Sequence, residues 1–441
     1  MSEVSHQERS DSAVSSCKRL KYHSLFQVIN VLPSLFLKRP TLKAKKYRNE
    51  KERCDMSSVR ISSICLSSSA LALGLSSYMM AGLIPLMGAD FNVSIGWAAQ
   101  LVTAFTLSYG LLSPVLVGMT GHYDLKNNVC AYLGIFVIAN AACVIVPEFY
   151  SLILLRAIAG ASAGAFLACG ITASTRLTSN ENKGKSISTI MAGMAIGTVI
   201  GLPASLVIAD YFGWRSAMII VSILGGIALI GLYLCLPSLP STMIKTEKSR
   251  FDLLSEWSVV RVLLISLFAA ISSLGMYTFL SPFVSSIYKE AYITVYFWYW
   301  GLGGVCGSIL IGYFVDDYDL KKILFIILGL LLLSFFGLVL LSHIYLPLIA
   351  LPLVIWGAVG WALQVPQNNE LIKLREDKGD GNLAVGLNQS SVYLGGAIGS
   401  MIGGVLVAVG VYPATLPLYF MLPVIIALIL LWTSKTHSSM D

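Results

Sequence analysis

One basic side chain lies at a depth where a charge is costly. Arg156 is the only clearly ionisable residue that we place well inside a long apolar stretch of the sequence. An arginine in the middle of an apolar layer costs a few kcal/mol even on the gentler scales, so it should face protein or water and find a partner. We therefore interpret Arg156 as a functional residue. The alternative is that its long side chain extends to the nearer surface, because the stretch is predicted to start near Tyr150.

Carboxylates that could exchange protons are confined to the ends of such stretches. No Asp or Glu lies deep in any of them, although proton exchange across a membrane needs a group that takes up and releases protons during the cycle. The remaining candidates are Glu370 at one face and Asp90 and Asp210 near the other. Each can equally be a helix-end charge. Proton-coupled movement of a solute and movement down its own gradient therefore both stay open.

A short charged loop occurs twice. Tyr123-Asp124-Leu125-Lys126 recurs 195 residues later as Tyr318-Asp319-Leu320-Lys321, and each copy lies between two apolar stretches. A carboxylate near the positive end of a helix is stabilised by about 0.3–1 kcal/mol when exposed. A contact of this kind that forms in one state only would bias an equilibrium between two states; the alternative is a solvated turn. The glycines and charged residues that these two loops, 118–128 and 312–322, offer for such contacts are Gly118, Asp124, Lys126, Gly312, Asp316, Asp319, Lys321 and Lys322.

Membrane-spanning helices are the elements that must carry these residues. Of the 441 residues, 56% are hydrophobic and 12% charged, with a mean hydropathy of +0.77, whereas a soluble domain would carry about twice that charge. Apolar stretches of about 20 residues are long enough to cross a bilayer as helices, and they lack the alternation of strands. The sequence predicts an all-α integral membrane protein with about twelve spans. These are 62–88, 96–118, 128–147, 151–174, 186–208, 214–236, 259–284, 292–314, 323–342, 346–367, 383–409 and 413–433.

Basic residues between the spans predict the orientation. On one side only Arg215 and Lys289 occur, whereas the other side carries most of the loop lysines and arginines. Because cytoplasmic loops are enriched in basic residues, both termini are predicted to be cytoplasmic. The net charge of +7 then needs no nucleic acid to explain it, since a basic tail beside a membrane is usually an orientation signal or a lipid-facing patch.

A polar linker over 238–257 divides six spans from six. We predict an N-terminal bundle over 58–237, a C-terminal bundle over 258–433 and a short cytoplasmic tail over 434–441. The polar, basic segment 1–57 is expected to be a disordered cytoplasmic segment, and Met56 is an alternative start. Two equivalent bundles have a cavity at their seam, which small shifts of one bundle against the other can open to alternate sides.

Glycines at a spacing of four mark equivalent helices in the two halves. Ala195-Ile196-Gly197 recurs as Ala397-Ile398-Gly399, each followed four residues later by another glycine. This spacing puts glycines on one face, where a neighbouring helix can approach closely, and a proline bends the axis. The predicted packing residues are Gly197, Gly201, Pro203, Gly395, Gly399 and Gly403.

The sequence gives little support for a catalytic serine or for a metal site. Gly160-Ala161-Ser162-Ala163-Gly164 matches the nucleophile elbow of serine hydrolases, but that motif needs a strand-turn-helix context and here lies within one apolar run. All five histidines fall at ends or in loops, so no base is placed to activate Ser162. The eight cysteines are scattered without a Cys-x-x-Cys pair and are interpreted as small buried hydrophobes. We predict no catalytic residues, no metal and no cofactor.

Polar and aromatic residues within the spans are candidates to line a cavity. Aromatic walls with a few amides suit a neutral or weakly polar organic molecule, although Tyr and Trp can equally be interface anchors, as in the run from Tyr296 to Trp300. Together with Arg156, the predicted cavity residues are Tyr78, Tyr109, Tyr277, Trp361, Gln364, Asn388, Gln389 and Tyr393.

Several segments resemble a known family. Ser77–Pro85 with Gln100–Phe105, Arg156 with Gly160, Gly197–Pro203 and Phe212–Arg215 are similar to the drug:proton antiporter branch of the major facilitator superfamily, and most similar to its arabinose-efflux-like and purine-efflux-like permeases. The resemblance covers about 58–433. It implies two six-helix bundles around a central cavity, a gating aspartate that faces a helix N-terminus of the other bundle, and a part for Arg156 in proton coupling.

The sequence departs from the family at two points. His122, Asn127 and Asn128 stand where the first loop tends to be basic, and the acid that many relatives carry near the position of Ser77 is absent. With these departures, the resemblance implies a monomeric efflux antiporter of the bacterial inner membrane, of the multidrug-resistance kind, that exports a drug, sugar or nucleoside by alternating access and uses a proton gradient. A facilitative uniporter and a transporter-like solute sensor are the alternatives.

Overall fold

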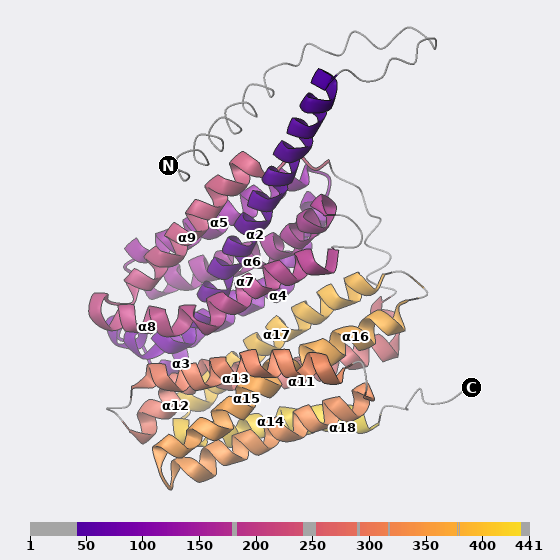
Figure 1. Ribbon diagram of the computed structural model, residues 1–441. Coiled ribbons are helices and arrows are strands. Elements are labelled where there is room, and N and C mark those ends of the chain that lie inside the picture. The colour runs from indigo at the N-terminus through magenta and orange to yellow at the C-terminus, as the bar shows by residue number, and fades with distance from the viewer. Residues whose placement is uncertain are drawn as a thin grey trace, which may run out of the picture.

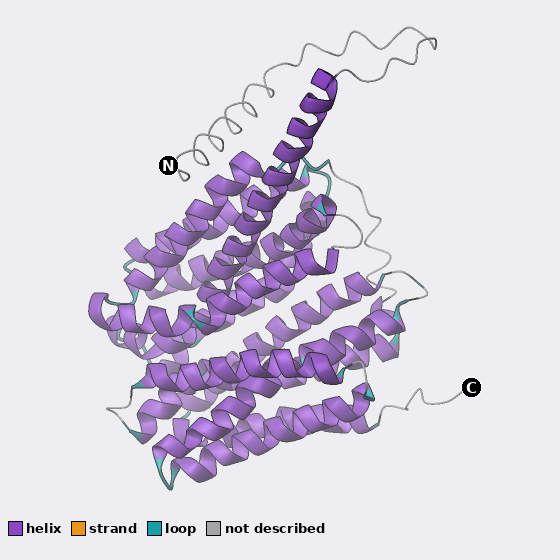
Figure 2. Ribbon diagram, in the orientation of Figure 1, coloured by secondary structure: helices purple, strands orange, loops and turns teal. Residues whose placement is uncertain are grey.

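The computed structural model describes residues 42–178, 183–240, 253–288, 292–315, 318–376, 378 and 380–433. Over these residues the regular elements are helices (Figure 2), which confirms the predicted all-α class. Eleven helical segments of the described residues are long and apolar enough to cross a membrane, and a bent pair formed by α7 and α8 makes a twelfth. The chain is thus a multi-pass membrane protein.

The helices form two groups that lie side by side (Figure 1). The first group consists of α2 (Leu42–Asp90), α3 (Ile95–Ala98), α4 (Gln100–Thr120), α5 (Leu125–Ile145), α6 (Phe149–Leu177), α7 (Lys183–Val199), α8 (Gly201–Phe212) and α9 (Arg215–Cys235). The second consists of α11 (Trp257–Thr278), α12 (Leu280–Ile287), α13 (Ile293–Phe314), α14 (Leu320–Ser342), α15 (Ala350–Ala362), α16 (Gln364–Leu374), α17 (Gly381–Ala408) and α18 (Leu416–Trp432), with short 3₁₀ turns η2 (Leu346–Ile349) and η3 (Pro413–Thr415).

The two groups pack their helices in the same order. In the first group α2 packs on α7 and α9, α4 on α6, and α5 on α6 and α9. In the second, α11 packs on α17 and α18, α13 on α15, and α14 on α15 and α18. Each helix therefore keeps the neighbours that its counterpart keeps, so the repeats in the sequence correspond to a repeated arrangement of helices.

Glycine faces allow the closest of these contacts. A methyl group added to Gly197 would overlap the carbonyl oxygen of Leu71 on α2, and one added to Gly399 would overlap that of Ile271 on α11. The other predicted packing glycines meet the same two helices: Gly201 meets the side chain of Leu75, Gly395 the backbone of Leu267, and Gly403 the ring of Phe279. The axis bends by 42° between α7 and the segment that starts at Pro203, where the sequence predicts a bend.

The predicted boundaries differ from the structure at two places. Residues 42–57 belong to α2, whereas the sequence analysis expected disorder over 1–57; residues 1–41 and 434–441 lie outside the described residues. Lys, Arg and Glu are good helix formers, which explains why the helix starts before its apolar part. The predicted span 259–284 is divided at Phe279 into α11 and α12.

Candidate functional site

The two groups meet along α4 and α17. The hydroxyl oxygens of Thr103 and Ser400 lie 2.8 Å apart, and the rings of Tyr109 and Tyr393 stack with centroids 3.6 Å apart and an interplanar angle of 15°. A methyl group on Gly96 would overlap the backbone of the other group. These contacts lie in the half of α4 that is nearer α3. Further contacts between the groups join α13 to α7 and α8, and α2 to α11 and α12.

An aromatic cluster fills the seam between the groups. The ring centroids of Tyr78 on α2 and Tyr277 on α11 lie 5.4 Å apart, and Trp300 on α13 lies 4.4 Å from Tyr277, 6.3 Å from Tyr78 and 6.0 Å from Trp361. Three predicted cavity residues and Trp300, from four helices, are thus brought together beside the Tyr109–Tyr393 stack. We call these six rings, Tyr78, Tyr109, Tyr277, Trp300, Trp361 and Tyr393, the seam cluster.

Trp300 is the member that the sequence analysis did not select. It belongs to the run from Tyr296 to Trp300, for which the sequence indicates interface anchoring as the alternative to cavity lining. The structure buries Tyr296, Phe297 and Trp300 and leaves Trp298 and Tyr299 half-buried. Tyr296 and Phe297 lie four and three residues before Trp300, and residues at these spacings share one helix face, so helical periodicity within the run is the signal that could have identified Trp300.

Polar atoms in the cluster remain available for hydrogen bonding. The indole nitrogen of Trp300 has no hydrogen-bond partner among the described residues. The hydroxyl of Tyr393 faces Ser77 and Tyr109 but forms no well-aligned hydrogen bond with them. Buried polar groups usually find partners, so these two atoms are candidates to bind the polar part of a solute.

The predicted amides lie farther along α16 and α17. Asn388 donates a hydrogen bond from Nδ2 to Oδ1 of Asn368 over 2.8 Å, which joins α17 to α16. Gln364 and Gln389 are half-buried. Gln367 is completely buried, and neither its nitrogen nor its oxygen has a partner among the described residues. It was not among the predicted cavity residues, although it lies three residues after Gln364 in the same helix.

Arg156 is buried inside the first group and does not extend to the surface. Its guanidinium donates to the hydroxyl of Ser76 over 3.0 Å and to the carbonyl oxygen of Ser76 over 2.9 Å, and the ring of Phe105 lies over it at 4.3 Å. The Ser76 hydroxyl in turn donates to the side-chain oxygen of Asn140. All four side chains are buried. The snorkelling alternative is therefore wrong, and Arg156 joins α6 to α2, α4 and α5.

Both copies of the charged loop cap a helix. Asp124 accepts a hydrogen bond from the backbone N–H of Lys126 over 2.8 Å at the start of α5, and Asp319 accepts one from Lys321 over 3.0 Å at the start of α14. An aspartate that precedes a helix satisfies N–H groups that have no partner within it. The repeated Tyr-Asp-Leu-Lys sequence thus encodes a repeated helix start.

The first loop does not reach the second group. Asp124 also binds the hydroxyl of Ser238 and the backbone N–H of Leu239, which follow α9 in its own group. Burial raises the pKa of Asp124, but the hydrogen bonds from Ser238 and from the backbone outweigh that effect and hold it below its usual value. The expected contact with a helix of the other bundle is not formed in this structure.

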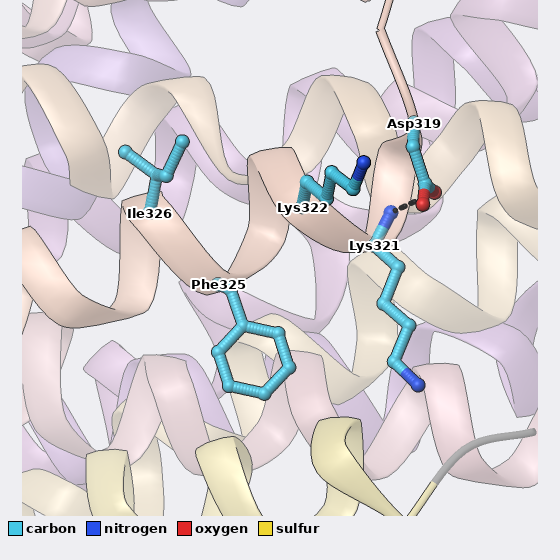
Figure 3. A pocket seen from close by; sticks show the side chains of 5 residues that line it. All are labelled: Asp319, Lys321, Lys322, Phe325 and Ile326. Atoms are coloured by element: carbon cyan, nitrogen blue, oxygen red, sulfur yellow. Dashed lines mark hydrogen bonds between the residues drawn. The ribbon is translucent and has the colours of Figure 1, made fainter. Parts of the chain in front are cut away.

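The second loop lines a surface pocket. A pocket of about 480 Å³ is bounded by Asp319, Lys321, Lys322, Phe325 and Ile326 at the start of α14 (Figure 3). Gly312 has open space beside it, and Asp316 lies outside the described residues. In the first loop, Lys126 instead lies 5.7 Å from the ring of Tyr233. The two loops share a cap but differ in what surrounds their lysines.

The three candidate coupling carboxylates lie at helix ends. Asp90 forms an ion pair with Arg215 over 2.7 Å and accepts a hydrogen bond from Trp214 over 3.0 Å, and both partners of the ion pair are more than a third exposed. Asp210 is exposed on α8. Glu370 is half-buried on α16, in range of the charges of Arg261 and Lys321. None of the three lies in the seam cluster.

An ion-pair network joins the start of α11 to the loop between α16 and α17. Arg375, which is 1% exposed, binds Glu256 and Asp380 over 2.6 Å each, and Lys378 binds Glu256 over 3.1 Å. The hydrogen bond from Lys378, helped by that from Arg375, holds the pKa of Glu256 below its usual value despite partial burial. The network fixes the end of the linker to the second group.

The serine-hydrolase pattern is a packing face. The hydroxyl of Ser162 donates to the carbonyl oxygens of Ile158 and Ala159 in its own helix, and a methyl group on Gly160 would overlap the backbone of Phe105. Within the described residues, no group of three or more His, Cys, Asp or Glu side chains could hold a metal ion.

Comparisons with known proteins agree with this architecture. The family model described as "Major Facilitator Superfamily" matches residues 66–375. The inner membrane transport protein YdhP of Escherichia coli (strain K12) is 23% identical over 382 residues, which cover 84% of this chain and 95% of that protein. A probable sugar efflux transporter of Helicobacter acinonychis is 22% identical over 347 residues, which cover 77% and 87%. The crystal structure of the nucleoside transporter NupG superposes with a TM-score of 0.69 at 14% identity and covers 84% of this chain and 99% of that one.

Proposed function

Because the chain belongs to the Major Facilitator Superfamily, we propose that it exports a small organic solute by alternating access of a site in the seam cluster. It is a membrane transporter and not an enzyme. The observation that carries the proposal is the placement of six rings from both groups at the seam, with unpaired polar atoms on Trp300 and Tyr393. A site shared between two similar groups changes its access when one group moves against the other.

Two further observations support export from the cytoplasm. One relative is described as a probable sugar efflux transporter, and another as a chloramphenicol resistance protein. The contacts between α4 and α17 lie near α3, at the end that the basic loops predict to be external. The structure then corresponds to a state closed toward the outside, in which a cytoplasmic solute can be loaded. We place the protein in the bacterial inner membrane, as a monomer with both termini in the cytoplasm.

Two energy sources are considered for transport of the solute. Exchange for protons is expected from the family resemblance, but it needs a carboxylate that reaches the site. The three candidates lie at helix ends in the described residues, which favours the second candidate, a facilitator that moves solute down its own electrochemical gradient.

Flux measurements in proteoliposomes test the function. Radiolabelled uridine, arabinose, chloramphenicol and salicylate are loaded in turn, and release is followed with and without an imposed pH gradient. We expect release of at least one solute to fall strongly for Tyr393→Leu and to be unchanged for Tyr419→Leu, because Tyr419 is exposed on α18, away from the seam. Binding without release would indicate a sensor. Equal release by both variants would contradict the proposed site.

A further inference from the structure

Arg156 has a positive charge without a negative partner. The side chain is 0% exposed, its two described hydrogen bonds go to neutral oxygens of Ser76, and its Nε atom has no partner among the described residues. No ion pair of the described residues includes it. A buried charge is normally compensated by an opposite charge, so the compensating group is missing from the described protein.

Among the described residues, no carboxylate lies beside Arg156 to compensate its charge. The described carboxylates within spans are Asp90, Asp210 and Glu370, all in the last turns of their helices, and Asp90 is paired with Arg215. The ionisable neighbour of Arg156 is the thiol of Cys143, which is also buried. A neutral thiol does not compensate a positive charge.

A row of rings connects the guanidinium with the seam. Phe105 lies over Arg156 at 4.3 Å, Tyr109 lies 6.4 Å from Phe105, and Tyr393 of the second group stacks on Tyr109. When α4 and α17 move apart, the stack opens, and Tyr109 and Phe105, both on α4, are the rings of this row that remain between the seam and the guanidinium. Arg156 therefore lies directly behind the first group's wall of the seam cluster.

We propose that the transported solute is an organic anion, an aromatic or otherwise planar carboxylate, whose charged group pairs with Arg156. This inference rests on the proposed export function and names its substrate class. The planar guanidinium with its free Nε donor suits a carboxylate, and the rings of the seam cluster bind the apolar part of the solute. A charge on the solute also supplies a driving force, because a potential of 100 mV, negative inside, supports about a 50-fold outward gradient of a monovalent anion.

Matched pairs of probes test the preference for an anion. Salicylate is compared with salicylamide, and p-aminobenzoate with p-aminobenzamide, by thermal shift and tryptophan fluorescence of the purified protein at pH 7.5. We expect each carboxylate to bind at least ten-fold more tightly than its amide. Equal or tighter binding of the amides, or no binding of either carboxylate, overturns the inference. This comparison uses the wild-type chain and does not depend on the folding of any variant.

Two substitutions connect the preference to Arg156. Arg156→Gln should abolish the preference for the carboxylates, and Arg156→Lys should keep part of it, because the charge remains while the fork of donors is lost. Cys143→Ser, which changes a neighbour of Arg156, should keep the full preference. A preference that survives Arg156→Gln, or that is lost with Cys143→Ser, would overturn the assignment.

Transport then separates this inference from the proposed function. In proteoliposomes, a valinomycin-imposed potential, negative inside, should accelerate release of the bound carboxylate, and reversal of the potential should slow it. If carboxylates bind with an Arg156-dependent preference but are not released, the export function fails while the site stands. If neutral solutes are released and carboxylates are not, the inference fails while the export function stands.

Discussion

The contact between α11 and α17 can be tested with two glycines of one helix. A methyl group on Gly399 would overlap the carbonyl oxygen of Ile271 and approach the Cα atom of Gly275, both of them backbone atoms that cannot rotate away. Gly386 lies on the same helix, and a methyl group there would meet nothing within 4 Å. Gly386→Ala is therefore a matched control for Gly399→Ala.

The magnitude follows from two terms. Replacing glycine with alanine within a helix stabilises it by about 0.5–1 kcal/mol, and this term applies to both positions. Overpacking of a tight contact costs about 1–3 kcal/mol, and this term applies to Gly399 alone. We expect the free energies of unfolding of the two variants to differ by about 1–3 kcal/mol, with Gly386→Ala the more stable.

Unfolding in mixed detergent micelles with a rising fraction of dodecyl sulfate measures this difference. Gly197→Ala should behave as Gly399→Ala does, because Gly197 meets Leu71 in the equivalent contact of the first group. If Gly399→Ala were as stable as Gly386→Ala, the two helices would not approach as closely as the structure shows. If Gly399→Ala were destabilised and Gly197→Ala were not, the repeated packing of the two groups would be refuted.

Three further experiments address the loops and the seam. Asp124→Ala should destabilise the protein by about 0.5–2 kcal/mol by removing the cap of α5. Because folding lowers the pKa of Asp124, this contribution is fully present above the unfolded-state pKa of about 3.9 and is lost as the pH falls below it, through the lower pKa of the folded protein. In unfolding titrations, a loss independent of pH would argue against it. Arg375→Gln should destabilise by about 1.5–3 kcal/mol, since Glu256 and Asp380 lose charged hydrogen bonds, and wild-type stability would refute the network. A double-mutant cycle of Tyr109→Leu and Tyr393→Leu should give a coupling energy of about 0.5–1.5 kcal/mol, and additivity would mean that the rings do not stack.

The fold was predictable because a bilayer permits few kinds of backbone structure. Lipid accepts only segments whose backbone groups are satisfied internally, so stretches of about 20 apolar residues identify spans directly. The glycine spacing in Gly197 and Gly399 predicted which faces pack closely, since only a residue without a side chain tolerates that approach. The bend at Pro203 was expected from the proline, whereas the division of a predicted span at Phe279 depends on a local break that a hydropathy pattern does not resolve at the level of single residues.

The site was less predictable than the fold, because it depends on how helices face one another. The rings of Tyr78, Tyr109, Tyr277, Trp361 and Tyr393 lie together at the seam, and their part in binding a solute stays a prediction. The partners of Arg156 could not be identified from the sequence. Its hydrogen bonds to Ser76 and its contact with Phe105 come from two other helices, whose rotation about their axes is set by packing in three dimensions.

The two copies of the charged loop share a helix cap but differ in their other contacts. Asp124 and Asp319 both cap a helix, because an uncapped start would leave backbone N–H groups unsatisfied in either group. Asp124, however, is also held by Ser238 and Leu239 of its own group. Groups that move as units carry such internal hydrogen bonds with them, so these bonds stabilise the first group without favouring one state of the transporter over the other. A bias between states must come from contacts that cross the seam, and in this structure those include the stack of Tyr109 on Tyr393, the Thr103–Ser400 pair and the contact of Tyr78 with Tyr277.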